Sequence, residues 1–391
     1  MKKPEPLEFK VIAGPEDFEP SSPDMKVVGA FNPGVTTIEE DGIEKTLLMV
    51  RVCEMPAEEP PGIVLLPHFT VTNSYCSPFK IEFDKETIKD LKGMGKKEVT
   101  LNNGLSRLRH ISYPVKVVST DGINIDWEKG REKNFYPCYE HERFGMEDLR
   151  IVRMVHPYDG HVYVITYVSP HRRHGVSTSI AITRDFKTFE RLPYGAEKPY
   201  PVFRNMKDVV PFPEMVPSPE KKDNLGNRKM EYGKLTRSNA FSDISSPTIS
   251  VVYSEHIEDL GPEMPLEVSA DNEISGTGAA VVGLEDIWLG VYHIIKTEAK
   301  EGREIKKYYG ALFGLKKDEP HKLLFRSGIL MQPDEHDRGH GFVPKVVYPQ
   351  GLIIQNNYAY IYSGEDDTWV SVRKYNLEDL IMFLKDSNSY H

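Results

Sequence analysis

Two acidic residues and an arginine stand close together in segment 144–152, which reads FGMEDLRIV. Glu147 and Asp148 come directly before a strand-like run, and Arg150 follows two positions later. A carboxyl group whose proton affinity is tuned by charged neighbours can serve as the acid that cleaves a glycosidic bond. An acidic pair before a strand can also be a solvated turn, so the segment alone leaves both interpretations open.

The elements that must position these residues are predominantly strands. Short runs rich in Val, Ile, Thr and Tyr are bounded by Gly, Pro, Asn and Asp, which is typical of antiparallel β structure. Two short helices are expected, at 84–91 and at 376–384, the second capped by Asn376. Strands are predicted at 46–52, 115–119, 161–168, 177–183, 248–253, 287–295, 307–313, 352–354 and 358–362.

The spacing of the strand pairs favours a β-propeller over a β-sandwich, because turn-rich hairpins recur at blade-like intervals. The 391 residues are therefore expected to form one all-β domain, 1–391, with short helical insertions. Segments 54–135 and 217–233 interrupt the pattern and are interpreted as insertions at loop positions.

Composition excludes several classes of protein. A formal net charge of −10 without a basic stripe disfavours nucleic acid as a partner. No apolar run is long enough for a membrane span or a signal peptide, which predicts a soluble, cytoplasmic protein. Cys53, Cys76 and Cys138 are widely spaced, so no disulfide framework is expected. No glycine-rich phosphate loop or His/Cys cluster occurs, and the sequence predicts no metal, nucleotide or flavin cofactor.

Segment 144–152 resembles the Gly-x-Glu-Asp-Pro-Arg signature of glycoside hydrolase family 130, and other segments match that family in the same order. The resemblance runs from Phe31 to the C-terminus, apart from the two insertions. The further matching segments are FNPG at 31–34, LLMVRV at 47–52, ITYVSP at 165–170, SIAITRDF at 179–186, FER at 189–191, KDVVPFPE at 207–214, WLGVYH at 288–293, GFVPKVVYP at 341–349 and YIYSGEDDT at 360–368.

The resemblance implies a five-bladed β-propeller whose central funnel holds a mannosyl unit. It implies that Asp148 is the general acid, which protonates the leaving oxygen through a hydroxyl of the bound sugar. The family's sugar contacts carry over to Asn32, Arg51, Asp208 and Asp367, beside Glu147 and Arg150 of the signature. Arg51 could instead be a paired core arginine and Asp208 a turn cap. The family resemblance is also compatible with a homo-oligomer.

Most members of the family are inverting phosphorylases, which need several cations to hold a phosphate dianion. Where those members carry a histidine and a lysine, this chain aligns with Thr236 and Gly283. These departures predict an inverting exo-β-mannosidase that hydrolyses β-1,2-linked manno-oligosaccharides. A hydrolase needs a carboxylate base, for which Glu273, Glu231 and Glu214 are the candidates.

Two alternatives to hydrolysis remain open at this level. Arg150, Arg172, Arg173, Arg237 and His293 could together bind phosphate, which would make the chain a β-mannoside phosphorylase that produces α-mannose 1-phosphate. A propeller with a degenerate site could instead bind carbohydrate without cleaving it, since a fold does not fix a function.

Overall fold

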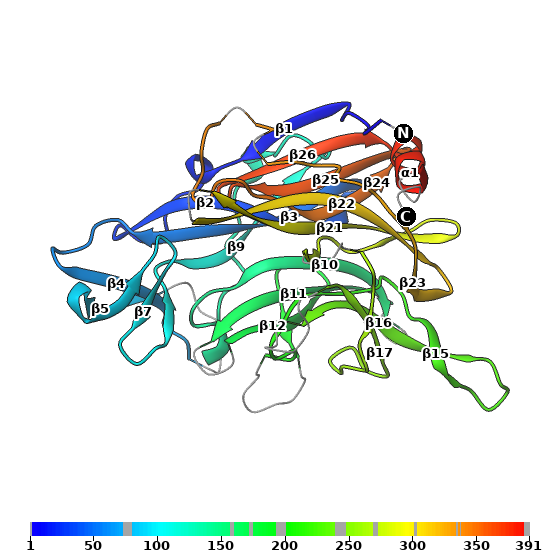
Figure 1. Cartoon of the computed structure of the whole chain (residues 1–391), viewed down its shortest axis with the longest axis horizontal. Coiled ribbons are helices and arrows are strands. Elements are labelled where there is room, and N and C mark those ends of the chain that lie inside the picture. The colour runs from blue at the N-terminus through cyan, green and yellow to red at the C-terminus, as the bar shows by residue number, and fades with distance from the viewer. Residues whose placement is uncertain are drawn as a thin grey trace.

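Antiparallel strands form nearly all of the regular structure in the computed structural model, which confirms the all-β class (Figure 1). The structure describes residues 2–72, 80–156, 160–171, 175–192, 201–238, 248–268, 273–300, 303–333, 335–336 and 338–386. The described part of the chain contains one α-helix, α1 (Leu377–Asp386), and four 3-10 helices: Pro15–Asp17, Ile88–Asp90, Trp127–Lys129 and Glu140–Glu142.

Five larger sheets follow one another along the described chain. The first contains β2 (Met25–Glu40), β3 (Ile43–Pro56) and β9 (Ile111–Ser119). The second contains β10 (Glu147–His156), β11 (Gly160–His171), β12 (Gly175–Thr183) and β13 (Glu190–Arg191). The third contains β14 (Met206–Pro211), β15 (Val216–Lys222), β16 (Arg228–Ser238), β17 (Ser250–Ser254) and β18 (Met264–Pro265).

Two further large sheets follow in the chain. The fourth contains β19 (Ile274–Thr277), β20 (Val282–Gly283), β21 (Ile287–Lys300), β22 (Arg303–Lys316) and β23 (Glu319–Arg326). The fifth contains β24 (Val347–Gln355), β25 (Tyr358–Glu365), β26 (Trp369–Asn376) and β1 (Glu8–Ala13). Because β1 pairs with β26, the first and last strands of the chain lie side by side (Figure 1).

Hydrophobic clusters join each large sheet to the next in the chain. Leu47 of β3 and Ile165 of β11 share one cluster, and further clusters join the second sheet to the third, the third to the fourth and the fourth to the fifth. A fifth cluster joins the last sheet to the first, through residues such as Val50 of β3 and Tyr362 of β25. The core therefore consists of layers between sheets.

Segment 54–135 departs from the expected simple insertion because β9 lies within it and pairs with β3. The added material is two small sheets: β4 (Ile63–Phe69) with β5 (Ile81–Thr87), and β6 (Leu91–Met94) with β7 (Glu98–Leu101) and β8 (Ser106–Leu108). Segment 217–233 lies in the β15–β16 hairpin, which extends away from the sheets in Figure 1.

The helix predicted at 84–91 is wrong. Its residues have good helix propensity, but β5 pairs along its length with the apolar strand β4, and only Ile88–Asp90 forms a 3-10 turn. Tertiary pairing therefore overrides local preference. The second predicted helix is confirmed as α1, where the Asn376 side chain accepts hydrogen bonds from the backbone N–H groups of Glu378 and Asp379 at 2.9 and 3.2 Å.

One cysteine departs from the prediction of no disulfide framework. Cys138 is disulfide-bonded, whereas Cys53 is free and buried. Spacing along the sequence cannot exclude such a bond, because folding brings distant cysteines together. Over the residues that the structure describes, the helices lack the length and apolar character that a membrane span requires.

Candidate functional site

The first three large sheets each begin with a strand that carries a bulge and a polar residue of positive φ. Asn32 in β2 has φ 44°, Asp148 in β10 has φ 50° and Asp208 in β14 has φ 55°. The strand register shifts at each of these positions. Left-handed backbone is uncommon outside glycine, is tolerated best by Asn and Asp, and clusters at functional sites. The bulges therefore redirect three polar side chains at equivalent places in three sheets.

Arg51 of β3 holds the two acidic residues of the signature together. Its Nη1 lies 2.8 Å from Asp148 Oδ1, and its Nη2 lies 2.6 Å from Glu147 Oε1. Asn32 Nδ2 also donates to Asp148 Oδ1, at 2.8 Å. Both described contacts of the Asp148 carboxyl thus fall on Oδ1, which leaves Oδ2 as the oxygen available for proton transfer.

Glu147 differs from Asp148 in its surroundings. Burial alone would raise the pKa of Glu147, but the charge of Arg51 and the hydrogen bond from His110 outweigh it and lower this pKa to about 2. His110 Nε2 lies 3.5 Å from Glu147 Oε1. Glu147 is therefore ionised at neutral pH and neutralises Arg51. Neighbouring carboxyl groups in different environments can take different roles in this way.

A second group of side chains surrounds Asp208, which is buried. Arg150 Nη2 lies 2.7 Å from its Oδ1, and Arg237 Nε of β16 lies 2.9 Å from its Oδ2. Tyr348 donates its hydroxyl to Oδ1 at 3.0 Å. Although burial opposes ionisation, Arg237 and Arg150 hold the pKa of Asp208 well below its usual range. Asp208 is thus the anion that places two arginines beside each other, and not a turn cap.

His293 of β21 completes this second group. Its Nε2 lies 3.4 Å from Arg237 Nη1 and 3.9 Å from Asp208 Oδ2, and its ring centroid lies 4.3 Å from that of Tyr348. Burial lowers the pKa of His293 to about 3, so the ring is neutral. A Cβ atom at Gly276 of β19 would overlap both Asp208 and His293. Only glycine allows β19 to approach this closely.

The arrangement suits an anionic ligand better than a metal ion. Lys207 pairs in register with Arg237, and its charge acts on Glu147, Asp208 and His293. Three cationic residues therefore converge where one buried carboxylate lies. In the ranges described above, no group of three or more His, Cys, Asp or Glu side chains is arranged to hold a metal ion.

Asp367 lies in the turn before β26, with φ 48°, and its Oδ2 is 2.7 Å from Lys97 Nζ. Burial opposes the charge of Lys97, but Asp367 raises the pKa of Lys97 above its ordinary value, so Lys97 is charged at neutral pH. Lys97 and His110 come from the part of the chain that was expected to be an insertion, and sequence reasoning missed both. Tyr348 was also missed, although it lies within the matching segment 341–349.

The described contacts of the three candidate bases are with residues other than Asp148. Glu231 is buried in β16, where it pairs with Lys221 at 2.7 Å. It is six residues from Arg237, which corresponds to roughly 20 Å along a strand. Glu273 pairs with Lys296 at 2.9 Å, and Glu214 is exposed in the turn between β14 and β15.

Neither position that suggested hydrolysis faces the cation cluster. Thr236 directly precedes Arg237 on β16, so its side chain points to the opposite face of the sheet. Gly283 is exposed in β20, where an added Cβ would lie 2.9 Å from the Trp288 ring and 3.5 Å from Lys317 Nζ. Substitution at these two positions therefore does not remove cations from the site. Arg172 and Arg173 lie outside the described residues.

Enzymes that cleave glycosidic bonds use Asp and Glu side chains as their catalytic groups, and the carboxyl groups of Glu147 and Asp148 lie together on Arg51. Comparison with known families agrees with this class. The model of glycoside hydrolase family 130, described as beta-1,4-mannooligosaccharide phosphorylase, matches residues 111–386. The chain belongs to this family.

Individual relatives cover most of the chain. It is 28% identical over 365 residues to the beta-1,2-mannobiose phosphorylase of Listeria innocua serovar 6a, which covers 90% of both chains. It is 24% identical over 279 residues to the 1,2-beta-oligomannan phosphorylase of Thermoanaerobacter sp. strain X514, covering 70% of this chain and 81% of that one. A structure of the Listeria innocua enzyme in complex with beta-1,2-mannobiose superposes with a TM-score of 0.72 and 23% identity, over 95% of this chain and 96% of that chain.

Proposed function

We propose that this protein is an inverting β-mannoside phosphorylase that cleaves β-1,2-linked manno-oligosaccharides with inorganic phosphate and releases α-mannose 1-phosphate. The observation that carries the proposal is the cation cluster of Arg150, Arg237 and Lys207 around Asp208. The preference for hydrolysis drawn from the sequence loses its basis, because Thr236 and Gly283 do not face this cluster. The named activities of the two curated relatives support both phosphorolysis and the β-1,2 linkage.

The charge of the cluster matches a phosphate dianion. Arg150, Arg237 and Lys207 contribute three positive charges and Asp208 one negative charge, while His293 is neutral, so the formal sum is +2. Each hydrogen bond to a charged group contributes roughly 1.5–3 kcal/mol. Two or three such bonds offset much of the cost of taking phosphate out of water, whereas a water nucleophile would gain nothing from them.

In the proposed reaction, Asp148 is the general acid. Arg51 and Asn32 hold its Oδ1, and the resemblance to the family implies that the proton of Oδ2 reaches the leaving oxygen through a hydroxyl of the bound mannosyl unit. A phosphate oxygen attacks the anomeric carbon from the opposite face as the glycosidic C–O bond breaks. The proton that the monohydrogen phosphate carried is then released from the mannose 1-phosphate and returns to Asp148, which restores the acid. The products are α-mannose 1-phosphate and the shortened saccharide.

We further propose that the five large sheets are the blades of a five-bladed propeller. The support is their succession along the chain, the hydrophobic layer between each neighbouring pair, and the layer between the fifth sheet and the first. Pairing of β1 with β26 would then close the ring. In this arrangement the bulges at Asn32, Asp148 and Asp208 face one central funnel.

The test is to incubate the enzyme with β-1,2-mannobiose and with β-1,4-mannobiose, each with and without millimolar phosphate, and to identify the products. We expect α-mannose 1-phosphate in amounts equal to the disaccharide consumed, only when phosphate is present, and faster from the β-1,2 linkage. Free mannose as the sole product, at a rate independent of phosphate, would instead establish the hydrolase that the sequence suggests. No cleavage of any mannoside would favour a binding protein.

A further inference from the structure

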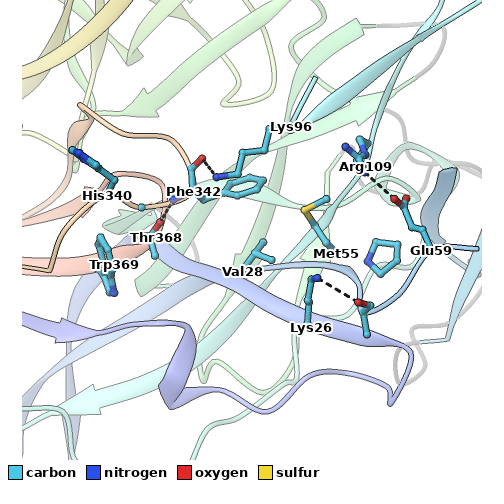
Figure 2. Close-up of a pocket in the computed structure, with 13 residues that line it drawn as sticks. Lys26, Val28, Met55, Glu59, Lys96, Arg109, His340, Phe342, Thr368 and Trp369 are labelled. Atoms are coloured by element: carbon cyan, nitrogen blue, oxygen red, sulfur yellow. Dashed lines mark hydrogen bonds and ion pairs between the residues drawn. The ribbon is translucent and has the colours of Figure 1, made fainter. Parts of the chain in front are cut away.

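A cavity of about 560 Å³ lies outside the site described above, and Figure 2 shows the residues that line it. Its walls come from the first residues of β2, the last residues of β3, the segments that adjoin the strands of the added small sheets, and the segments around Phe342 and Trp369. This volume falls within the range of cavities that bind small molecules. The residues that line it do not include Asp148, Arg51 or Asp208.

The cavity is adjacent to the site and yet distinct from it. The Phe342 ring lines the cavity and packs edge to face against His110, with centroids 6.2 Å apart, and His110 contacts Glu147. Thr368, also in the lining, follows Asp367 in the chain and accepts a hydrogen bond from the Phe342 backbone N–H at 2.6 Å. Phe342 thus forms part of the wall between the cavity and the catalytic carboxylates.

The lining is cationic, although the chain as a whole carries a net charge of −10. Lys26, Lys96 and Arg109 belong to it, and Glu59 is the one carboxylate among its described residues. Glu59 is already paired with Arg109 at 2.9 Å, as Figure 2 shows. The two lysines are therefore in excess over the negative charge of the cavity.

These cations retain hydrogen-bond capacity. Lys26 donates to the carbonyl of Ala57 at 3.3 Å, and Lys96 donates to the carbonyl of Phe342 at 2.8 Å. An ammonium group has three donors, so each has others to offer. Arg109 donates through Nη1 to the carbonyl of Gly95 at 3.1 Å and through Nη2 to Glu59 at 2.9 Å, and each of these nitrogens has a second N–H donor.

The remaining lining of the cavity is apolar and partly aromatic, and it includes Val28, Met55, Phe342 and Trp369 (Figure 2). Flat apolar surfaces beside a few charged groups suit a ligand that has a carbon ring and an anionic group. We propose that this cavity is a second binding site, separate from the catalytic cluster, and that it takes a sugar phosphate. The lysines and Arg109 hold the phosphate, and the sugar ring lies against the apolar side of the cavity, beside Trp369.

Calorimetric titration of the whole protein in phosphate-free buffer tests this site, with mannose 6-phosphate, mannose and inorganic phosphate as separate probes. We expect mannose 6-phosphate to bind at least about tenfold more tightly than mannose. The double substitution Lys26→Met with Lys96→Met should weaken its binding at least about tenfold. Both lysines are exposed, so the fold should tolerate their replacement.

Two controls separate this site from simpler explanations. The pair Lys187→Met with Lys222→Met removes the same charge at exposed positions outside the cavity and should leave the dissociation constant of mannose 6-phosphate unchanged. Arg237→Met disables the catalytic cation cluster and should also leave it unchanged. The proposal is wrong if mannose 6-phosphate binds no more tightly than mannose, if the cavity variant binds it normally, or if Arg237→Met abolishes its binding. Because the titration involves no turnover, failure of the proposed phosphorolysis would not affect this result.

Discussion

Replacement of Arg237 by Met examines the proposed phosphate site at one residue. Arg237 Nε lies 2.9 Å from Asp208 Oδ2, and Nη1 approaches His293 Nε2 at 3.4 Å. The guanidinium is thus held on one edge, and its remaining donors can reach a ligand. Methionine retains an apolar side chain in place of the methylene groups of Arg237, and Asp208 keeps its contacts with Arg150 and Tyr348. We therefore expect the variant to fold.

The loss of one charge-assisted hydrogen bond removes about 1.5–3 kcal/mol of phosphate binding. At about 1.4 kcal/mol per factor of ten, the KM for phosphate should rise roughly 10- to 150-fold. The KM for the mannoside should change little, because the acid Asp148 is held by Arg51 and Asn32. Initial rates measured against phosphate concentration at saturating β-1,2-mannobiose give both values.

Arg153→Met is the matched control, because Arg153 is exposed on β10 and the substitution removes the same charge. It should leave both KM values unchanged. If Arg237→Met lowered kcat without changing the KM for phosphate, Arg237 would support the structure of the site and would not bind the nucleophile. The assignment of the cation cluster would then be wrong.

Three further changes have defined expectations. Asp148→Asn should lower kcat on mannobiose at least about 10²-fold while thermal unfolding stays unchanged; near-normal turnover would refute its role as acid. Gly276→Ala should lower kcat/KM at least about tenfold, because its Cβ would displace Asp208. Gly93→Ala is the control and should be neutral, because there is space for a methyl group at Gly93. Equal activity of the two variants would contradict this steric argument. Burial lowers the pKa of Lys234 to about 7, so the unfolded chain binds more protons between pH 7 and 10 and stability rises with pH in that window. Urea unfolding at pH 7 and at pH 9 measures this effect. Between these pH values the free energy of unfolding should rise by about 2 kcal/mol more in the wild type than in Lys234→Met. An equal rise in both proteins would contradict the lowered pKa of Lys234.

Features carried by local pattern could be predicted from the sequence. The β-rich runs gave the all-β class, and Asn376 marked the start of α1. The acidic signature led to Glu147, Asp148 and Arg150, which the fold brings together with Arg51 and Asn32. These residues stand in short segments whose order along the chain resembles the family.

Features that depend on contacts between distant segments could not be predicted. Lys97 meets Asp367 across 270 positions of sequence, and nothing in the local pattern of 91–101 indicates that partner. The direction of a strand side chain is equally hidden, since a shift of one position moves it to the other face. The position where the family carries a histidine therefore aligns with Thr236 in sequence, although the neighbouring Arg237 is the residue that faces the cluster. Glu231 is close to that segment in sequence, but it lies far along the same strand.

Whether phosphate is a substrate is tested most directly by the reverse reaction. A phosphorylase must synthesise a disaccharide from α-mannose 1-phosphate and mannose, while a hydrolase has no route to this product. The enzyme should be incubated with both sugars, phosphate release followed over time and the saccharide identified by nuclear magnetic resonance. We expect β-1,2-mannobiose in amounts equal to the phosphate released, and loss of both products in Asp148→Asn. Absence of any disaccharide from an enzyme that still liberates mannose from β-1,2-mannobiose would contradict the proposed function.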